Sequence, residues 1–299
     1  MTGSVSYAYG VAGPSPALDD AVRGLRGVDG APVRVVAAGD VAAVVSDVPA
    51  ADFEERPLAA HLEDLDWLEA VARAHHGVID AVAARVTVLP LRLATIYRDD
   101  QGVRAVLTAG VAAFRSRLAR LAGHVEWGVK LYAEPAAAPD GPPGGSGESS
   151  RLSPGRAYLR SRSRERTARD EAHRAAADAV RRVHEAASAH AVEHVRHRVQ
   201  QGPLVRGTSE NVSNDAYLVP SGRSDAFLAA VREAAGAGAP VRAEITGPWA
   251  PYSFAAGAPG AEGRADTENR ADTEDRAGAE GRADTEGRAD GAREEAAPG

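Results

Sequence analysis

The order of strand-like and helical segments in the second half of the chain limits its fold more than any other sequence feature. Strands repeat their apolar residues every two positions, and helices repeat them about every 3.6 positions. From His124 onward these periods give a strand, a long helix, two short strands, a helix and a final strand. The segments lie at 125–131, 153–199, 204–207, 215–219, 224–235 and 241–245. The order β-α-β-β-α-β predicts a ferredoxin-like domain over residues 124–256.

Two details of this domain can be read from the pattern. Its first strand alternates apolar residues with Glu126, Gly128 and Lys130, which predicts one buried face. Its first helix starts at Ser153-Pro154, a capping residue followed by a proline. A helix running on to Val199 would be roughly 69 Å long, whereas strands reach about 20 Å. This very long first helix must therefore break or extend beyond its domain.

The first part of the chain gives the same order over residues 4–97, with one added helix. Apolar residues alternate at 5–11, and a hairpin at 33–46 turns at Gly39-Asp40, where glycine accepts positive φ. Pro90 interrupts the strand-like run 86–97, so we expect an edge position or a bulge there. Helical stripes fall at 58–72, 76–85 and 103–121, with Asp99 or Asp100 as the cap of the last. We expect an N-terminal α+β domain over residues 1–123.

The two predicted α/β domains are accompanied by two low-complexity segments. Residues 135–152 are rich in proline, glycine and serine and are predicted to form a flexible loop. Residues 257–299 contain near-repeats of six residues, with 12 acidic residues and six arginines. This tail accounts for −6 of the net charge of −7, and its repeats offer no aromatic side chain and no aliphatic side chain larger than that of alanine to bury. The fold class is therefore α+β, with a disordered acidic tail.

Composition removes several functional classes. The chain has no cysteine, which rules out disulfides, thiolate nucleophiles and iron–sulfur clusters. No Walker A, dinucleotide-binding or His-Glu-x-x-His pattern is present. We therefore expect no enzyme activity and no cofactor. No signal peptide or membrane span is expected either, because the sequence lacks the apolar runs that each requires.

Three histidines in the predicted long helix suggest a metal site. His190, His194 and His197 have the spacing that would place three imidazoles on one helix face. Glu193 and the neighbouring arginines, however, are typical of a solvated face. We favour the solvated face and expect no metal, and a metal-dependent enzyme that uses these histidines stays open as a third hypothesis, which metal content after purification would test.

The start of the same helix is rich in arginine. Eight arginines and three acidic residues between Arg151 and Arg174 give this segment a charge of +5. One hypothesis is a nucleic-acid-binding regulator. The segment offers few aromatic stacking partners, and Lys130 is the only lysine among 35 basic residues, as expected for an arginine-biased genome. Nucleic-acid binding through this segment is therefore kept as an alternative function.

The last part of the predicted folded region is unusually aromatic. Three aromatic residues lie within six positions in a chain that is 5% aromatic, and two prolines stiffen the segment. The candidate residues are Trp249, Pro251, Tyr252 and Phe254. They can fasten the chain end to the core, or they can form an aromatic contact surface for a partner. We favour the first and expect Trp249 to be largely buried, against the sheet or between the domains.

An ordered set of motifs resembles the gas vesicle protein GvpL/GvpF family over residues 4–256. The matching segments are Tyr7-Ala-Tyr-Gly-Val11, Val88-Leu-Pro-Leu-Arg-Leu-Ala-Thr95, Gly128-Val-Lys-Leu-Tyr132, Ala157-Tyr-Leu159, Asn214-Asp-Ala-Tyr-Leu-Val219 and Thr246-Gly-Pro-Trp-Ala-Pro-Tyr-Ser-Phe254. Their order and the terminal Gly-Pro-Trp-x-Pro-Tyr-Ser-Phe pattern make the resemblance specific. The repeat tail lies outside it.

This resemblance implies a cytoplasmic accessory protein of gas vesicle formation. Members of such a family are expected to have two α/β domains and to associate with the shell protein GvpA and with other accessory proteins. The resemblance implies neither enzyme activity nor a cofactor. A gas-facing shell subunit must be small and apolar and would aggregate before assembly, so a protein that masks it has a physical rationale.

Overall fold

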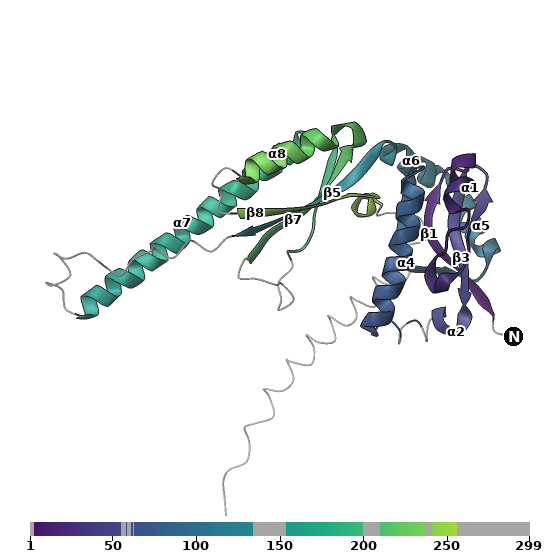
Figure 1. Cartoon of the computed structure of the whole chain (residues 1–299), viewed down its shortest axis with the longest axis horizontal. Coiled ribbons are helices and arrows are strands. Elements are labelled where there is room, and N and C mark those ends of the chain that lie inside the picture. The colour runs from purple at the N-terminus through teal and green to yellow at the C-terminus, as the bar shows by residue number, and fades with distance from the viewer. Residues whose placement is uncertain are drawn as a thin grey trace, which may run out of the picture. The chain divides into compact units, whose positions relative to one another are not determined.

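The computed structural model describes residues 3–54, 58, 61, 63–133, 154–199, 210–236 and 241–255 (Figure 1). These residues contain two four-stranded antiparallel sheets with helices packed against them. Residues 1–256 form one compact unit. The predicted loop 135–152 and the predicted disordered tail lie outside the described residues. The division into domains at residue 123 stays a prediction.

The first sheet has the strand order β2-β3-β1-β4. Its strands are β1 (Ser4–Ala12), β2 (Val33–Ala38), β3 (Val41–Pro49) and β4 (Val88–Tyr97). All of its pairs are antiparallel. Gly39, with φ of 62°, lies in the tight turn between β2 and β3, so the predicted hairpin is confirmed.

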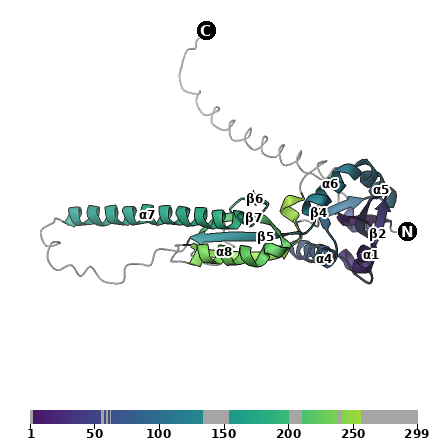
Figure 2. The ribbon, with the colours of Figure 1, turned by 90° about the horizontal axis from the view of Figure 1, so that it is seen from above.

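Helices cover both faces of this sheet (Figure 2). On one face lie α1 (Pro16–Val22) and α4 (Leu65–Ala83), with the short elements η1 (Val28–Gly30) and α2 (Ala50–Phe53) nearby. On the other lie α5 (Asp100–Ala109) and α6 (Val111–Leu121). Asp99 caps α5 as predicted, because its carboxylate accepts a hydrogen bond from the Gly102 amide at 2.9 Å.

The break that the sequence pattern suggests between residues 72 and 76 is absent. We expected separate helices at 58–72 and 76–85, but α4 runs without a break from Leu65 to Ala83. Its cap is Asp64, which accepts hydrogen bonds from the Asp66 and Trp67 amides. The apolar stripe within the helix belongs to Val71, Val78, Ile79 and Val82, which are buried.

Strand β4 leaves the sheet for four residues after Pro90. Gly10 of β1 pairs with Pro90, and Ala8, only two residues away, pairs with Thr95. The expected edge position and irregularity at Pro90 are thus confirmed. Two buried side chains hold the displaced segment: the Tyr7 hydroxyl accepts from the Ala94 amide at 3.1 Å, and His75 Nε2 lies 3.3 Å from the Leu91 carbonyl.

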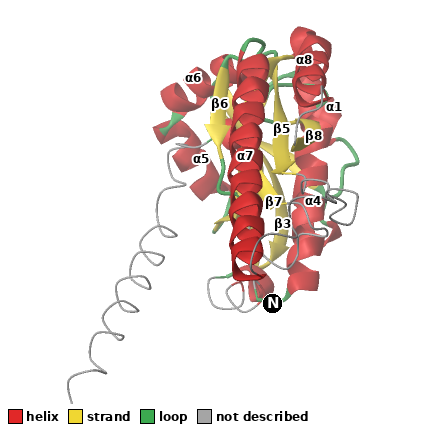
Figure 3. Cartoon of the chain, turned by 90° about the vertical axis from the view of Figure 1, so that its left-hand side faces the viewer, coloured by secondary structure: helices red, strands yellow, loops and turns green. Residues whose placement is uncertain are grey.

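The second sheet repeats this strand order as β6-β7-β5-β8. Its strands are β5 (His124–Ala133), β6 (Glu193–Arg196), β7 (Glu210–Pro220) and β8 (Val241–Trp249). Its helices are α7 (Pro154–Ser188) and α8 (Ser224–Gly236), with η3 (Ser221–Arg223) and η4 (Tyr252–Phe254) as short turns. In the described part of the chain α7 and α8 pack on the same face, as seen in Figure 3.

The long helix both breaks earlier than expected and extends beyond the sheet (Figure 2). It ends at Ser188 and not at Val199, because backbone pairing to β7 competes with the helix: the Val192 amide donates to the Leu218 carbonyl at 2.8 Å, and Glu193–Arg196 form β6. The predicted strand 204–207 lies outside the described residues. None of the described helices is long and apolar enough to cross a membrane.

Candidate functional site

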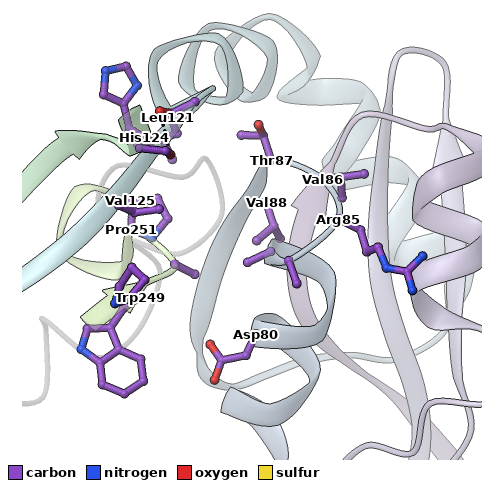
Figure 4. A pocket seen from close by; sticks show the side chains of 16 residues that line it. Asp80, Arg85, Val86, Thr87, Val88, Leu121, His124, Val125, Trp249 and Pro251 are labelled. Atoms are coloured by element: carbon purple, nitrogen blue, oxygen red, sulfur yellow. Dashed lines mark hydrogen bonds between the residues drawn. The ribbon is translucent and has the colours of Figure 1, made fainter. Parts of the chain in front are cut away.

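A pocket of about 620 Å³ lies between the end of β8 and the start of β4 (Figure 4). Its walls come from both sheets: the end of α4 with the following segment 83–88, the start of β5, and the chain from Pro248 to Pro251. Val88 and Val125 give it apolar surface, and Asp80 faces Trp249 across the opening (Figure 4). The terminal aromatic segment, defined here as Trp249 to Phe254, therefore forms part of a concave surface.

Trp249 is exposed at the rim of this pocket. Its exposed fraction is 46%, which makes it one of three exposed large hydrophobic residues among those described. The prediction that Trp249 is largely buried is therefore wrong. Pro251 also lines the pocket but is buried, so of the four candidate residues these two share the concave surface.

The backbone before Trp249 explains why its side chain does not enter the core. Pairing between β5 and β8 shifts register between Glu126 and Gly128, opposite the segment that contains Gly247. Gly247 has φ of 129°, and a Cβ there would lie 2.8 Å from the Glu126 carbonyl oxygen. Only glycine fits this close approach. The strand leaves its regular register just before Trp249.

The segment after Trp249 is fastened by a buried carboxylate. Ser253 donates twice to Glu126, from its amide at 2.8 Å and from its hydroxyl at 2.6 Å. His197 Nε2 lies 3.0 Å from the same hydroxyl. We call Glu126, Ser253 and His197 the clasp. It joins β5, the residue after β6 and the terminal aromatic segment, which are far apart in sequence.

Burial governs the electrostatics of the clasp. Glu126 is 8% exposed, and burial raises the pKa of its carboxyl, while the hydrogen bonds from Ser253 act in the opposite direction. Each of the two carboxylate oxygens has a donor from Ser253. The charge is thus satisfied only while the terminal segment stays in place.

Arg120, at the end of α6, holds the far end of the same segment. One nitrogen of its guanidinium donates to the Phe254 carbonyl at 2.6 Å, and the other lies 2.9 Å from a Glu193 carboxylate oxygen. Phe254 itself is 3% exposed. The segment is therefore fixed at Ser253 and Phe254, while Trp249 remains accessible.

Tyr252 packs towards the first sheet. Its ring centroid lies 5.1 Å from that of His76 on α4, and both Tyr252 and the neighbouring Ala250 contact the core of the first sheet. The Tyr252 hydroxyl is buried without a hydrogen-bond partner, and burial raises its pKa. Tyr252 and Phe254 thus pack into the fold, whereas Trp249 does not, and the role of the four candidate residues as fastening or as contact surface stays a prediction.

The three histidines proposed as metal ligands are not on a helix. His194 lies on β6, and His190 and His197 lie before and after that strand. His194 contacts His184 of α7, with ring centroids 4.6 Å apart, and lies 3.6 Å from Asp215. Within the described ranges no group of three His, Asp or Glu side chains is placed to hold a metal ion.

The arginine-rich start of α7 projects beyond the strands (Figure 2). Among the α7 residues whose side chains the structure describes, those buried against the sheet are Ala176, Ala179, Val183 and Ala187. Arg166 and Arg174 are exposed. The nucleic-acid hypothesis stays untested.

Sequence reasoning missed the clasp. Glu126 stands in an alternating strand on the face opposite Trp127, a position that normally points to solvent. Its burial results from the terminal segment, which lies 127 residues away in the chain. In the sequence, the one indication of the clasp was Ser253, a residue with a hydroxyl group among the aromatic residues of the terminal segment.

Comparisons with known proteins are consistent along the body of the chain. The family described as gas vesicle synthesis protein GvpL/GvpF matches residues 5–256. The chain is 46% identical to gas vesicle protein L of Streptomyces sp. (strain CB03234), over 85% of this chain and 94% of that protein. It is 32% identical to gas vesicle protein F of the same strain, over 83% and 98% of the two chains.

Solved structures show a similar fold. The crystal structure of GvpF from Microcystis aeruginosa matches with a TM-score of 0.56 at 20% identity and covers 84% of this chain and 98% of that one. GvpF from Anabaena sp. PCC7120 matches with a TM-score of 0.54 at 18% identity, over 84% and 96%. The mixed α/β arrangement with two antiparallel sheets is thus shared with these structures.

Proposed function

Because this chain belongs to the GvpL/GvpF family of gas vesicle synthesis proteins, we propose that it binds the apolar shell protein GvpA during gas vesicle formation and uses the pocket beside Trp249 to do so. The family supports a gas vesicle role. The contact with GvpA and the place of that contact are our proposal. Other accessory proteins of the vesicle are expected as further partners.

One observation carries the proposal: a tryptophan that is 46% exposed stands at the rim of a pocket whose walls are partly apolar. Tryptophan is enriched among residues that dominate binding energy, because it buries a large rigid surface. Exposed apolar surface costs free energy in water, which favours a partner that covers it. An apolar segment of a shell subunit is a partner of this kind.

The clasp and the prolines prepare the site for binding. Ser253 is fixed by Glu126, and Pro248 and Pro251 limit the backbone on both sides of Trp249. A surface that is already ordered loses less conformational entropy when its partner binds. This supports a contact surface that is built before the shell protein arrives.

Further parts of the proposal follow from the sequence. Both sheets have the strand order that supports a ferredoxin-like assignment, and we retain it for residues 124–256. We propose that the protein acts in the cytoplasm and at the gas vesicle, without catalysis and without a cofactor.

The test is co-purification of GvpA with the tagged full-length chain after co-expression. We expect the wild type to retain GvpA and Trp249→Ala to lose most of it. The matched control is Leu65→Ala, because Leu65 is 77% exposed and is absent from the pocket. It should retain GvpA like the wild type.

Equal loss in both variants would show that any exposed apolar side chain matters, and equal retention would remove Trp249 from the contact. Either result overturns the proposed site. Complete absence of GvpA from the wild-type preparation would overturn the proposed partner.

A further inference from the structure

Strand β8 is an edge strand of the second sheet. One side of it pairs with β5, and no strand among the described residues pairs with the other side. An edge strand presents unpaired backbone N–H and C=O groups and is therefore a template for another strand. Natural edges are commonly shortened or covered, but β8 runs for nine residues from Val241 to Trp249.

A groove follows this edge on the helix side of the sheet. It has a volume of about 440 Å³ and lies between the end of α8 and the first half of β8. Val241, Ala243 and Ile245 form one wall, and Ala235 of α8 contributes to the other. Ala243 and Ile245 are half-buried, so part of their apolar surface still faces this groove. Additional apolar side chains placed along the edge would fill it.

The sequence of β8 is complementary to itself around Ala243. If two copies of β8 pair antiparallel with Ala243 opposite Ala243, then Arg242 stands opposite Glu244 of the other copy, twice by symmetry. Val241 likewise stands opposite Ile245, also twice. The first pairs join opposite charges on one face of the sheet, and the second join apolar residues on the helix face.

We propose that two copies of this chain associate through β8, antiparallel and centred on Ala243, to form a continuous eight-stranded sheet. A two-fold axis through Ala243 makes the interface isologous, as in most protein dimers. The five residues from Val241 to Ile245 provide about four to six main-chain hydrogen bonds across the axis. The apolar side chains of each copy enter the groove of the other.

The charges favour a second copy over an unrelated strand. Arg242 is exposed and its guanidinium lies 4.6 Å from the centre of the Tyr132 ring, which holds it on the open face of the sheet. Glu244 is half-buried on the same face. A strand from another protein would need an acidic residue opposite Arg242 and a basic residue opposite Glu244. A second copy of β8 supplies both.

The experiment measures the mass of the full-length chain by sedimentation over a wide range of concentrations. The wild type should dimerise. Arg242→Glu places two glutamates opposite each other twice, and Glu244→Arg does the same with arginines. Each single reversal should weaken the dimer at least about tenfold, since two pairs change from attraction to repulsion.

Mixing the two reversed variants is the decisive step. In a mixed dimer the two glutamates of the Arg242→Glu copy lie opposite the two arginines of the Glu244→Arg copy. Both pairs then join opposite charges, so the mixture should dimerise at concentrations at which each variant alone stays mostly monomeric. A wild type that stays monomeric, or single reversals that dimerise like the wild type, would overturn the proposal. A mixture that stays monomeric would overturn it as well.

A second variant tests the register of the pairing without changing the charge of the strand. The chain has no cysteine, so Ala243→Cys introduces a single thiol on the proposed axis. Directly opposite residues of an antiparallel pair have Cβ atoms about 4.5–5.5 Å apart, within reach of oxidation or of a short bismaleimide. We expect a covalent dimer with Ala243→Cys and none with Val192→Cys, which is placed at another exposed position. Equal cross-linking of the two would contradict the register.

Discussion

The two sheets of this protein share one strand order but differ in what covers them. In both, the chain builds the sheet in the order second, third, first and fourth strand. The first sheet has helices on both faces, α1 and α4 on one and α5 and α6 on the other. The described helices of the second sheet, α7 and α8, pack on a single face. Among the described residues, the same topology therefore leaves more surface of the second sheet without a helix on it.

This difference suggests a division of roles. The first half contains most of the large buried core, including the fully buried Tyr7 and Tyr9. The second half carries Trp249, the pocket rim and the accessible edge of β8. We infer that the first half mainly supplies stability and the second half mainly supplies contact surfaces.

The two halves even disturb their sheets at corresponding places. The first strand of each sheet shifts register against the last, at Ala8/Gly10 in one and at Glu126/Gly128 in the other. In each case the displaced segment of the last strand contains or follows a proline. Buried polar side chains hold the chain there: Tyr7 and His75 in the first half, and the clasp in the second.

The largest effect is expected from the core of the first half. Ile79 is 1% exposed, and Ile79→Ala should lower the free energy of unfolding by about 2–5 kcal/mol. Urea unfolding measures this, with Leu65→Ala as the exposed control that should change stability by at most about 0.5 kcal/mol. A small effect at Ile79 would contradict the assignment of stability to the first half.

Acid should weaken the first half through His75. Burial is the main cause that lowers the pKa of His75 from 6.5 to about 4, with His76 adding to it. Between these values the unfolded chain binds the proton and the folded chain does not, so stability falls as the pH drops from 6.5 towards 4. Titration of this one histidine should lower the free energy of unfolding by about 3 kcal/mol over this pH range.

The pH dependence can be assigned by comparison with His75→Gln. This variant cannot titrate, so its stability should change less between pH 6.5 and 4 than that of the wild type. Identical slopes for the two proteins would show that His75 is not the responsible group.

The clasp should matter less to stability than the core. Glu126→Ala leaves the hydroxyl and amide of Ser253 without their acceptor, at an expected cost of about 1–3 kcal/mol. Hydrogen exchange at Ser253 should accelerate, while exchange in β1 should change little. If both regions exchange faster by the same factor, the clasp is not a local fastening of the second half.

The smallest stability effect is expected at the pocket rim. Trp249→Ala should cost about 1–2 kcal/mol, since roughly half of the side chain is already in water, compared with about 3–5 kcal/mol for a fully buried tryptophan. Denaturant unfolding measures the difference. A loss of about 3–5 kcal/mol would show that Trp249 is a core residue, and it would contradict the distinction between the two halves.

The sequence predicted which strands and helices are present better than it predicted where they end and what packs against them. Period-two and period-3.6 patterns located the strands β1 to β5 and β8, because such patterns reflect local alternation of burial. They failed at the end of α7, where pairing to β7 decides the structure of residues 193–196. That contact depends on another strand and leaves no period in so short a segment.

For the same reason, the sequence predicted where the candidate site lies in the chain but not which of its residues are exposed. Clustering of aromatic residues identified the terminal segment, and Phe254 is buried as a fastening residue should be. The exposure of Trp249 depends on Gly247, on the register shift in β5 and on the buried Glu126. These are properties of the packed sheet and are not encoded in the spacing of aromatic residues.

The most direct test of the contact role is ¹⁹F NMR of the full-length chain labelled with 5-fluorotryptophan. The chain has three tryptophans, and Trp249→Phe assigns the resonance of interest. We predict that the Trp249 resonance shows a solvent isotope shift in the free protein and shifts or broadens when GvpA is added, whereas those of Trp67 and Trp127 change little. A Trp249 resonance without solvent sensitivity, or one that GvpA leaves unchanged while a complex forms, would contradict the account.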